Sequence, residues 1–246
     1  MESRQIAPSS RSGLQTALDV IVAPKAAFLA LREVPTWGWA FLVAAVLAVV
    51  GSIVTGPAIG HAMATEMPAK LAASPQFAQM PADQRDAAIA RTVGFFVTFA
   101  KFSFIIVIVG ILVSGLIQAL IMLIANAIGK GDGNFKKFWA LSINVSVVGS
   151  GVASIVLMII VLIRGADSFN STVDIAGSVP SLALVAPGAG KTLATFLGTI
   201  NIFNIWTAVL LAMGMGTVAR IPRGVAVTFA VLMLVAAAGF AASGQR

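Results

Sequence analysis

The chain has 246 residues, 59% of them hydrophobic and only 10% charged, with a net charge of +7. A soluble core does not need so much apolar surface, so much of it must face lipid. The absence of cysteine excludes disulfides and thiolate chemistry, and the singly scattered Lys and Arg residues form no aromatic-interleaved cluster for nucleic acid.

The first residues predict a disordered tail over 1–13, without the apolar core of a cleavable signal peptide. Apolar side chains then recur near a helical repeat from Leu14 through Leu18 and Ile21. Pro24 divides this stretch, because proline is tolerated in the first turn of a helix but not in its interior. We predict a short interfacial amphipathic helix, which serves either as a membrane anchor or as a surface for a partner.

Five apolar stretches follow, and none contains Asp, Glu, Lys or Arg: residues 37–57, 102–128, 138–163, 193–219 and 224–243. Each is long enough to cross a bilayer as a helix, which takes about 20 apolar residues. The predicted fold is an all-α polytopic membrane protein, with a single membrane domain over residues 14–243 built as a five-helix transmembrane bundle.

Two longer loops separate these spans. Residues 61–92 carry three prolines and many polar residues, and they predict an extracytoplasmic excursion with a helical second half. Residues 164–191 are rich in Gly, Ser, Pro and Asn and predict irregular coil. Their Gly-Lys-Thr ending is typical of a phosphate-binding loop, but Val185 replaces the first glycine and no strand precedes it.

His61 is the only histidine, so no cofactor or metal site is predicted.

The informative polar residues are uncharged and lie within the spans. The candidate cluster consists of Gln118, Asn126, Ser146, Ser150, Ser154, Asn201, Asn204 and Trp206. Small residues spaced by four allow helices to approach closely, so we expect Ser114, Ser150 and Ala212 to meet where the second, third and fourth spans pack. The polar side chains either hold the helices together or line a polar pocket or path.

The pair Asn201 and Asn204 shares part of one helix face, and Trp206 lies mid-span, although tryptophan prefers the membrane interface. An unsatisfied amide in hydrocarbon costs several kcal/mol. Both amides must therefore find partners, and we expect these to be each other, Gln118 or the serines of the third span.

Residues 201–206 read Asn-Ile-Phe-Asn-Ile-Trp, and residues 213–216 read Met-Gly-Met-Gly. With the segment 18–31, in which Pro24 precedes Phe28 by four residues, and with a basic hairpin between the last two spans, the chain resembles the Yip-domain family. These multispan proteins are named for interaction with Ypt/Rab GTPases in eukaryotes and are also widespread in bacteria. The resemblance covers roughly residues 14–242 and implies a cytoplasmic N-terminus, five spans and no known catalytic residues. The very short N-terminal tail departs from the eukaryotic pattern, so GTPase binding is not carried over.

The leading hypothesis is a non-enzymatic membrane protein that organises partner proteins or the local bilayer. The alternative is a transporter for a small solute or a lipid that uses the polar faces inside the bundle. No nucleophile and base pair is visible, which argues against an enzyme. Expected partners are the lipid bilayer and other membrane proteins or a second copy of the chain. The composition suits a bacterial inner membrane.

We predict a cytoplasmic N-terminus and an outside C-terminus, because Lys and Arg in short loops are retained in the cytoplasm. The two short loops, 130–137 and 220–223, are both basic and lie on the same side of a five-span bundle. A reporter that is active only in the cytoplasm tests this orientation. When fused after Arg246 it should be inactive, and an active fusion would disprove the number of spans or the orientation.

Overall fold

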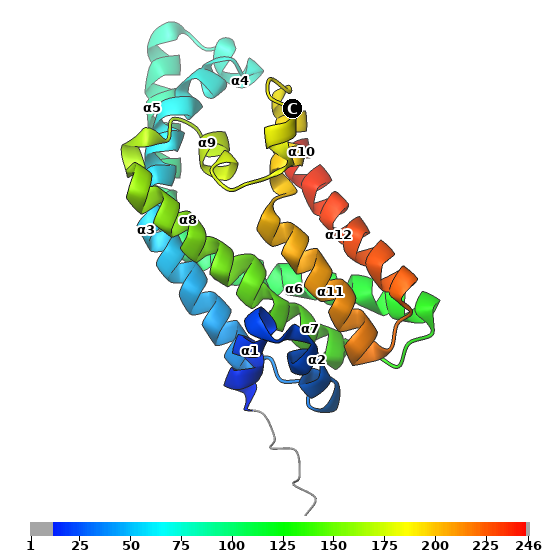
Figure 1. Ribbon diagram of the computed structural model, residues 1–246. Coiled ribbons are helices and arrows are strands. Elements are labelled where there is room, and N and C mark those ends of the chain that lie inside the picture. Colours follow the sequence, from blue (N-terminus) through cyan, green and yellow to red (C-terminus); the bar gives the residue numbers. More distant parts are fainter. Residues whose placement is uncertain (1–11, 245–246) are drawn as a thin grey trace, which may run out of the picture.

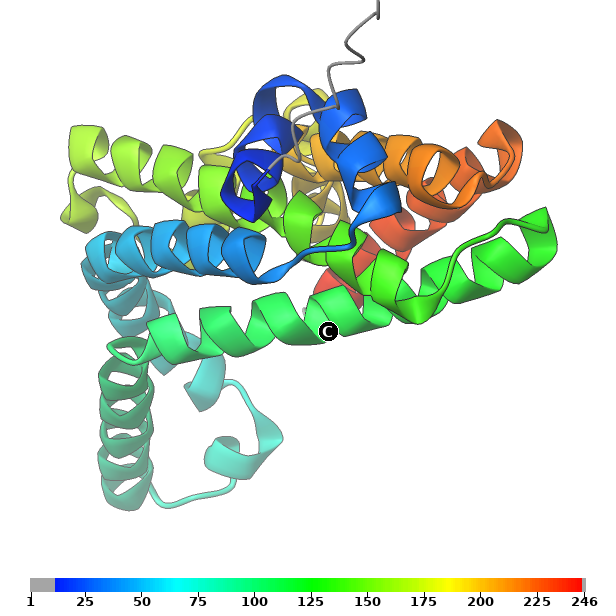
Figure 2. The ribbon, with the colours of Figure 1, turned by 90° about the horizontal axis from the view of Figure 1, so that it is seen from below.

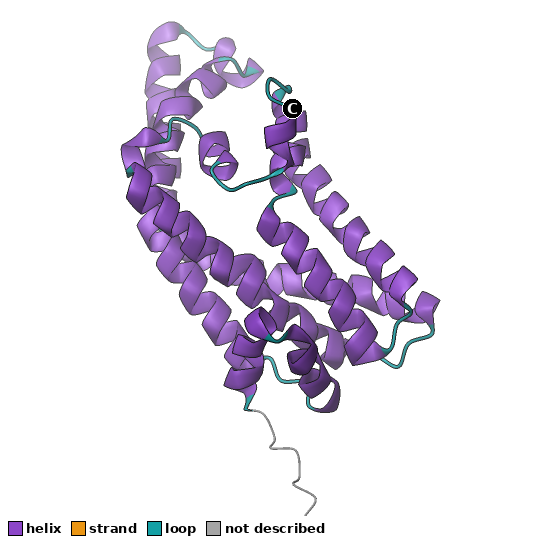
Figure 3. Ribbon diagram, viewed as in Figure 1, coloured by secondary structure: helices purple, strands orange, loops and turns teal. Residues whose placement is uncertain are grey.

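The computed structural model describes residues 12–244, which are helical almost throughout and contain no named strand (Figure 3). Of the tail predicted over residues 1–13, residues 1–11 lie outside the described part, and the first helix begins at Gly13. Arg246, where the topology fusion is placed, also lies outside it.

Five helices are long and apolar enough to cross a membrane, which confirms the predicted all-α, five-span architecture. They are α3 (Gly38–Ala72), α6 (Ser103–Gly129), a continuous third helix, α11 (Ile202–Ala219) and α12 (Arg223–Ser243). The third helix joins α7 (Phe135–Ser146), the π-helical turn η1 (Val147–Val152) and α8 (Ala153–Arg164). Figure 1 shows α3, α8, α11 and α12 as a bundle, with α6 crossing behind them.

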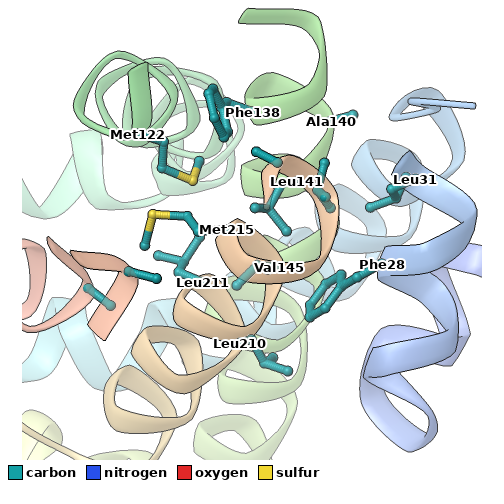
Figure 4. Close-up of a cluster of buried hydrophobic side chains, with 14 of the residues drawn as sticks. Phe28, Leu31, Met122, Phe138, Ala140, Leu141, Val145, Leu210, Leu211 and Met215 are labelled. Carbon is teal, nitrogen blue, oxygen red and sulfur yellow. The ribbon is translucent and has the colours of Figure 1, made fainter. Parts of the chain in front are cut away.

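Two short helices, α1 (Gly13–Val22) and α2 (Pro24–Glu33), precede the bundle, and Pro24 divides them as predicted. Some apolar side chains of α1 and α2 are buried against the bundle, and others are exposed. Phe28 and Leu31 of α2 are fully buried in the core shared with α7 and α11 (Figure 4). The expected membrane-surface helix therefore places its largest inward side chains against the bundle, because the ends of α7 and α11 offer an apolar surface that they fit.

The main core gathers at the end of the bundle next to α1 and α2. There, side chains from α2, α6, α7, α11 and α12 interdigitate (Figure 4). Its fully buried large members include Phe28, Leu31, Met122, Phe138, Leu141, Leu210 and Met215. Figure 4 shows Met122 and Met215 facing each other across this core, where their flexible thioethers fill the space between helices.

The packing face of α6 differs from the one expected. Ser114 and Gly110 are exposed, and the buried row runs one position along, through Gly115 and Ala119. Ser114 needs no neighbouring helix, because its hydroxyl donates to the Ile111 carbonyl at 3.2 Å. The expectation that Ser114 would meet the other small rows is therefore wrong.

The first span also packs closely in the bundle, although close packing was expected where the second, third and fourth spans meet. A Cβ added at Gly51 of α3 would lie 2.6 Å from the Ser154 Cβ, so the two backbones approach closely. Gly151 of η1 approaches α3 in the same way, because a Cβ added there would lie 3.1 Å from Leu47 Cδ1. These contacts are of the small-residue type that holds membrane helices together.

The chain beyond the apolar part of α3 forms an arm. Helix α3 continues to Ala72 and is followed by α4 (Pro75–Ala78) and α5 (Ala82–Ala100). The predicted helical second half of the excursion is present, with Pro81 as the residue before its first turn. Figure 2 shows a sharp bend between α5 and α6.

The loop predicted as irregular coil over residues 164–191 contains short helices instead. They are η2 (Ala166–Ser168), α9 (Thr172–Gly177) and η3 (Leu182–Val185), followed by α10 (Lys191–Thr199). Contacts to α3 hold this segment in place. The Phe169 carbonyl lies 3.0 Å from His61 Nδ1, and the Thr172 hydroxyl donates to Glu66 Oε1 at 2.8 Å.

Substitution of Gly51 by Leu tests the contact between the first and third spans. The new side chain would meet the Ser154 backbone oxygen 2.9 Å from its Cβ, so we expect a loss of about 1–3 kcal/mol in unfolding free energy. Gly110→Leu is the control, since nothing lies within 4 Å of a Cβ added there. This variant should be no less stable than the wild type, because leucine favours a helix over glycine by about 0.5–1 kcal/mol. Equal thermal stability of both variants in detergent would contradict the assigned faces.

Candidate functional site at the interruption of the fourth span

The fourth predicted span is interrupted rather than continuous. Helix α10 ends at Thr199 and α11 begins at Ile202. Asn201 occupies the position before α11, where its Oδ1 accepts hydrogen bonds from the backbone N–H groups of Phe203 and Asn204, both at 3.0 Å. The Asn204 amide donates back to the Thr199 carbonyl at 2.7 Å. The two asparagines thus satisfy the backbone on both sides of the break.

The preceding loop pairs with the interrupted backbone. The Leu182 N–H donates to the Ile200 carbonyl at 3.1 Å, and the Ile202 N–H donates to the Pro180 carbonyl at 3.2 Å. An isolated antiparallel bridge between Ser181 and Asn201 results. Non-helical backbone near hydrocarbon is tolerated where protein covers it, and this loop supplies part of the cover.

A cavity of about 450 Å³ lies beside the break, between the third helix, α9 and α10. Its polar lining is made only of hydroxyls and amides: Ser154, Thr172, Thr195, Thr199, Asn201 and Asn204. Small residues such as Gly149, Ala153 and Gly198 make room for the cavity. No charged residue lines it, so its chemistry suits an uncharged hydrogen-bonding group or an apolar chain.

The third helix changes its winding next to this cavity. The turn η1 is π-helical, and π-helical turns are frequent at functional sites. Gly149 lies within η1, and a Cβ there would be 2.7 Å from the Thr207 hydroxyl of α11. The hydroxyls of Thr207 and of Thr195 in the cavity wall are buried without a hydrogen-bond partner in the described structure. Neither threonine was singled out from the sequence, although a hydroxyl in an apolar span is a visible signal.

The structure brings three members of the sequence-derived cluster together at the cavity, namely Ser154, Asn201 and Asn204. The other members lie elsewhere: Ser146 and Ser150 earlier on the third helix, Gln118 and Asn126 on α6, and Trp206 in the second turn of α11. The hydroxyls of Ser146 and Ser154 bond carbonyls of their own helix, at 2.7 and 2.6 Å.

Two details of the expectation for the fourth span need correction. The asparagine amides bond the backbone at the break and not Gln118 or the serines of the third span. Trp206 is not mid-span, because the break shortens the helix and leaves this residue close to its first turn. The break contains no charged residue, so residues 193–219 were predicted as one continuous span.

Asn144 is a further amide that the sequence reasoning missed. Its Nδ2 donates to the Thr36 carbonyl at 2.8 Å, which ties the third helix to the chain just before α3. The residue is 1% exposed. Asn144 is an amide inside an apolar stretch, and the same feature led to the choice of Asn201 as a candidate from the sequence.

Asn126 holds the loop between α6 and α7, because its Oδ1 accepts from the Gly133 N–H at 3.0 Å. In the same loop, the Asp132 N–H donates to the Ala219 carbonyl at the end of α11, at 2.9 Å. The Asp132 carboxylate also pairs with Arg220 at 3.4 Å and lies 4.0 Å from Arg32. This end of the molecule is thus fastened by hydrogen bonds and ion pairs, far from the cavity.

Comparison with known proteins matches most of the chain. The Yip1 domain family model covers residues 18–244. The chain is 30% identical over 198 residues to a protein named membrane protein YknW from Bacillus subtilis (strain 168). The aligned region covers 80% of this chain and 75% of that protein. No solved structure matches.

Asn201→Leu tests the role of the amide at the break. Loss of a side-chain cap costs about 0.5–2 kcal/mol, and we expect a fall of that size in unfolding free energy in detergent. Asn201→Ser keeps an oxygen that can accept from the N–H groups of Phe203 and Asn204, so its stability should stay close to that of the wild type. Equal loss in both variants would argue against a capping role.

Proposed function

We propose that the chain, which belongs to the Yip1 domain family, is a non-catalytic multi-pass membrane protein that organises the local bilayer or partner membrane proteins. Within the described residues, no group of three or more His, Asp or Glu side chains could hold a metal ion. The cavity at the break is uncharged, and Asn201 Oδ1 and Asn204 Nδ2 bond the backbone. These observations favour a structural use of the polar residues over chemistry.

The observation that carries the proposal is apolar surface outside the five spans, at both ends of the bundle. At one end, α1 and α2 expose a set of aliphatic side chains: Leu14, Leu18, Val22 and Leu29. At the other end, α5 exposes Phe95, Phe96 and Phe99, and the rings of Phe95 and Phe99 stack at 6.0 Å. Figure 1 shows these helices at opposite ends of the molecule.

Exposed apolar side chains on helices next to membrane spans suit the bilayer interface or another membrane protein. Since the buried sides of α1 and α2 already pack on the bundle, their outer sides are free to act on the surroundings. We further propose that the protein resides in a bacterial inner membrane with α1 and α2 at the cytoplasmic face. The dense basic charge of the loops at that end supports this orientation.

Transport remains the second candidate function, and the cavity of about 450 Å³ favours it. Its hydroxyl and amide lining, together with the absence of charge, would suit a neutral solute or part of a lipid. A transport path would require the loop paired with Ile200 and Ile202 to open, because it covers the break.

Reconstitution into liposomes separates these functions. If the protein organises the bilayer, the full-length wild type should change vesicle diameter and acyl-chain order, measured by cryo-electron microscopy and probe anisotropy, and should move neither solute nor lipid. The double variant Leu18→Ser/Phe95→Ser should weaken the effect, since it removes one exposed apolar side chain at each end. Gln15→Ala and Arg91→Gln, on the same helices, are the controls.

The same liposomes can contradict the proposal. If the protein moves a solute or a lipid, and Asn201→Leu abolishes that movement without changing thermal stability, the transporter function replaces it. If the double variant acts on vesicles as the wild type does, the exposed apolar surfaces are not the active ones.

A further inference from the structure

A second cavity, of about 580 Å³, lies between α3 and α5 and is separate from the cavity at the break. Its α3 wall is one helix face, on which Ser52, Gly56 and Gly60 recur every fourth residue. Val97 of α5 and Lys101, just after α5, form the opposite wall. The glycines leave space, since nothing lies within 4 Å of a Cβ added at Gly56.

The depth of this groove along α3 follows from helix geometry. Helix α3 begins at Gly38, between two tryptophans that suit a membrane interface. At 1.5 Å per residue, Ser52 lies about 21 Å and His61 about 35 Å from that end. The hydrocarbon core is about 30 Å thick. The groove therefore starts within the hydrocarbon and ends at the headgroups of the leaflet opposite to α1 and α2.

The groove changes in chemistry along the same direction. Val97 faces Gly60, at 3.8 Å from a Cβ added there, so Lys101, one turn further along the antiparallel α5, lies level with about Gly56. Ile53 lines the deeper end of the groove, and His61 lines its outer end. Lys101 is the only charged lining residue, and no carboxylate lines the groove. Gly56 lies about 27 Å from the start of α3, so Lys101 is close to the boundary of the hydrocarbon, and a lysine there above apolar residues is complementary to a lipid with an anionic headgroup.

The neighbouring groups leave this positive charge uncompensated. Glu66 is the carboxylate that follows His61 on α3, but it pairs with Lys70 at 3.2 Å and accepts from Thr172. The His61 Nδ1 must donate to the Phe169 carbonyl, which can only accept. The other ring nitrogen, Nε2, is then the acceptor of the neutral ring, so it can accept a hydrogen bond from a headgroup hydroxyl but cannot donate one to a phosphate.

We propose that the groove between α3 and α5 binds one anionic phospholipid of this leaflet. The phosphate lies at Lys101, and one acyl chain runs past Gly56 and Ile53 toward the membrane centre. A zwitterionic lipid fits less well, because its headgroup cation would meet Lys101 and find no carboxylate in the lining. This inference concerns a site distinct from the break in the fourth span and does not rest on the proposed function.

Native mass spectrometry of the full chain tests the proposal, with phosphatidylglycerol and phosphatidylcholine of identical chains titrated separately. The wild type should bind phosphatidylglycerol more tightly. A lysine near anionic lipid contributes about 1 kcal/mol, so Lys101→Gln should weaken this binding about fivefold. Arg91→Gln is the control for charge, since Arg91 lies on α5 and does not line the groove.

A steric pair of variants tests the same groove without changing its charge. Gly56→Leu fills the channel and should weaken the binding of phosphatidylglycerol, whereas Gly94→Leu, on α5 and equally free of close neighbours, should not. Thermal melting shows that each variant is folded before its binding is compared.

Three results would overturn the proposal. The first is equal affinity for the two lipids in the wild type. The second is that neither Lys101→Gln nor Gly56→Leu differs from its control. The third is that inorganic phosphate alone displaces the lipid at equal concentration, since the apolar channel would then contribute nothing.

Discussion

The need to satisfy the backbone where a membrane helix stops determines much of this structure. An unpaired N–H or C=O group in hydrocarbon costs several kcal/mol. Asparagines supply the partners at three places: Asn126 at the loop after α6, Asn144 at the entry to α3, and Asn201 at the break before α11. Each amide bonds backbone that has no helical partner. The polar residues inside this apolar chain are thus explained first by the geometry of its interruptions.

The break at Asn201 has consequences for the neighbouring helices. The loop that pairs with Ile200 and Ile202 carries α9, which contacts α3 and α10, and η3, which contacts α10. Small residues such as Gly149 leave a cavity between this segment and the third helix. Thr195 and Thr207 keep buried hydroxyls without partners nearby. In a tightly packed bundle such groups are rare, and Asn144 Oδ1 is another in the third helix.

The sequence predicted the five spans and the division at Pro24, because hydropathy and proline act locally. The interruption at Asn201 was not predicted, since the uncharged Asn201 and Asn204 were interpreted as polar residues on a continuous helix face. The face of α6 was also assigned wrongly. Rows through Ser114 and through Gly115 both carry small residues, and only the shape of the facing helix, with Ile143 against Gly115, decides between them. The roles of the cluster around Asn201 depend on the backbone path and not on local composition.

The two ends of the molecule differ in how firmly they are held. At the end with α1 and α2, the main core is filled, and Asp132 joins the α6–α7 loop to the end of α11. Toward the other end lie both cavities, the short helices of the outer loop and the bent arm of α5. Parts with few buried apolar contacts open at lower free energy than the core. We therefore expect ligand binding or loop opening at the end with the cavities, while the filled core holds the second to fifth spans together.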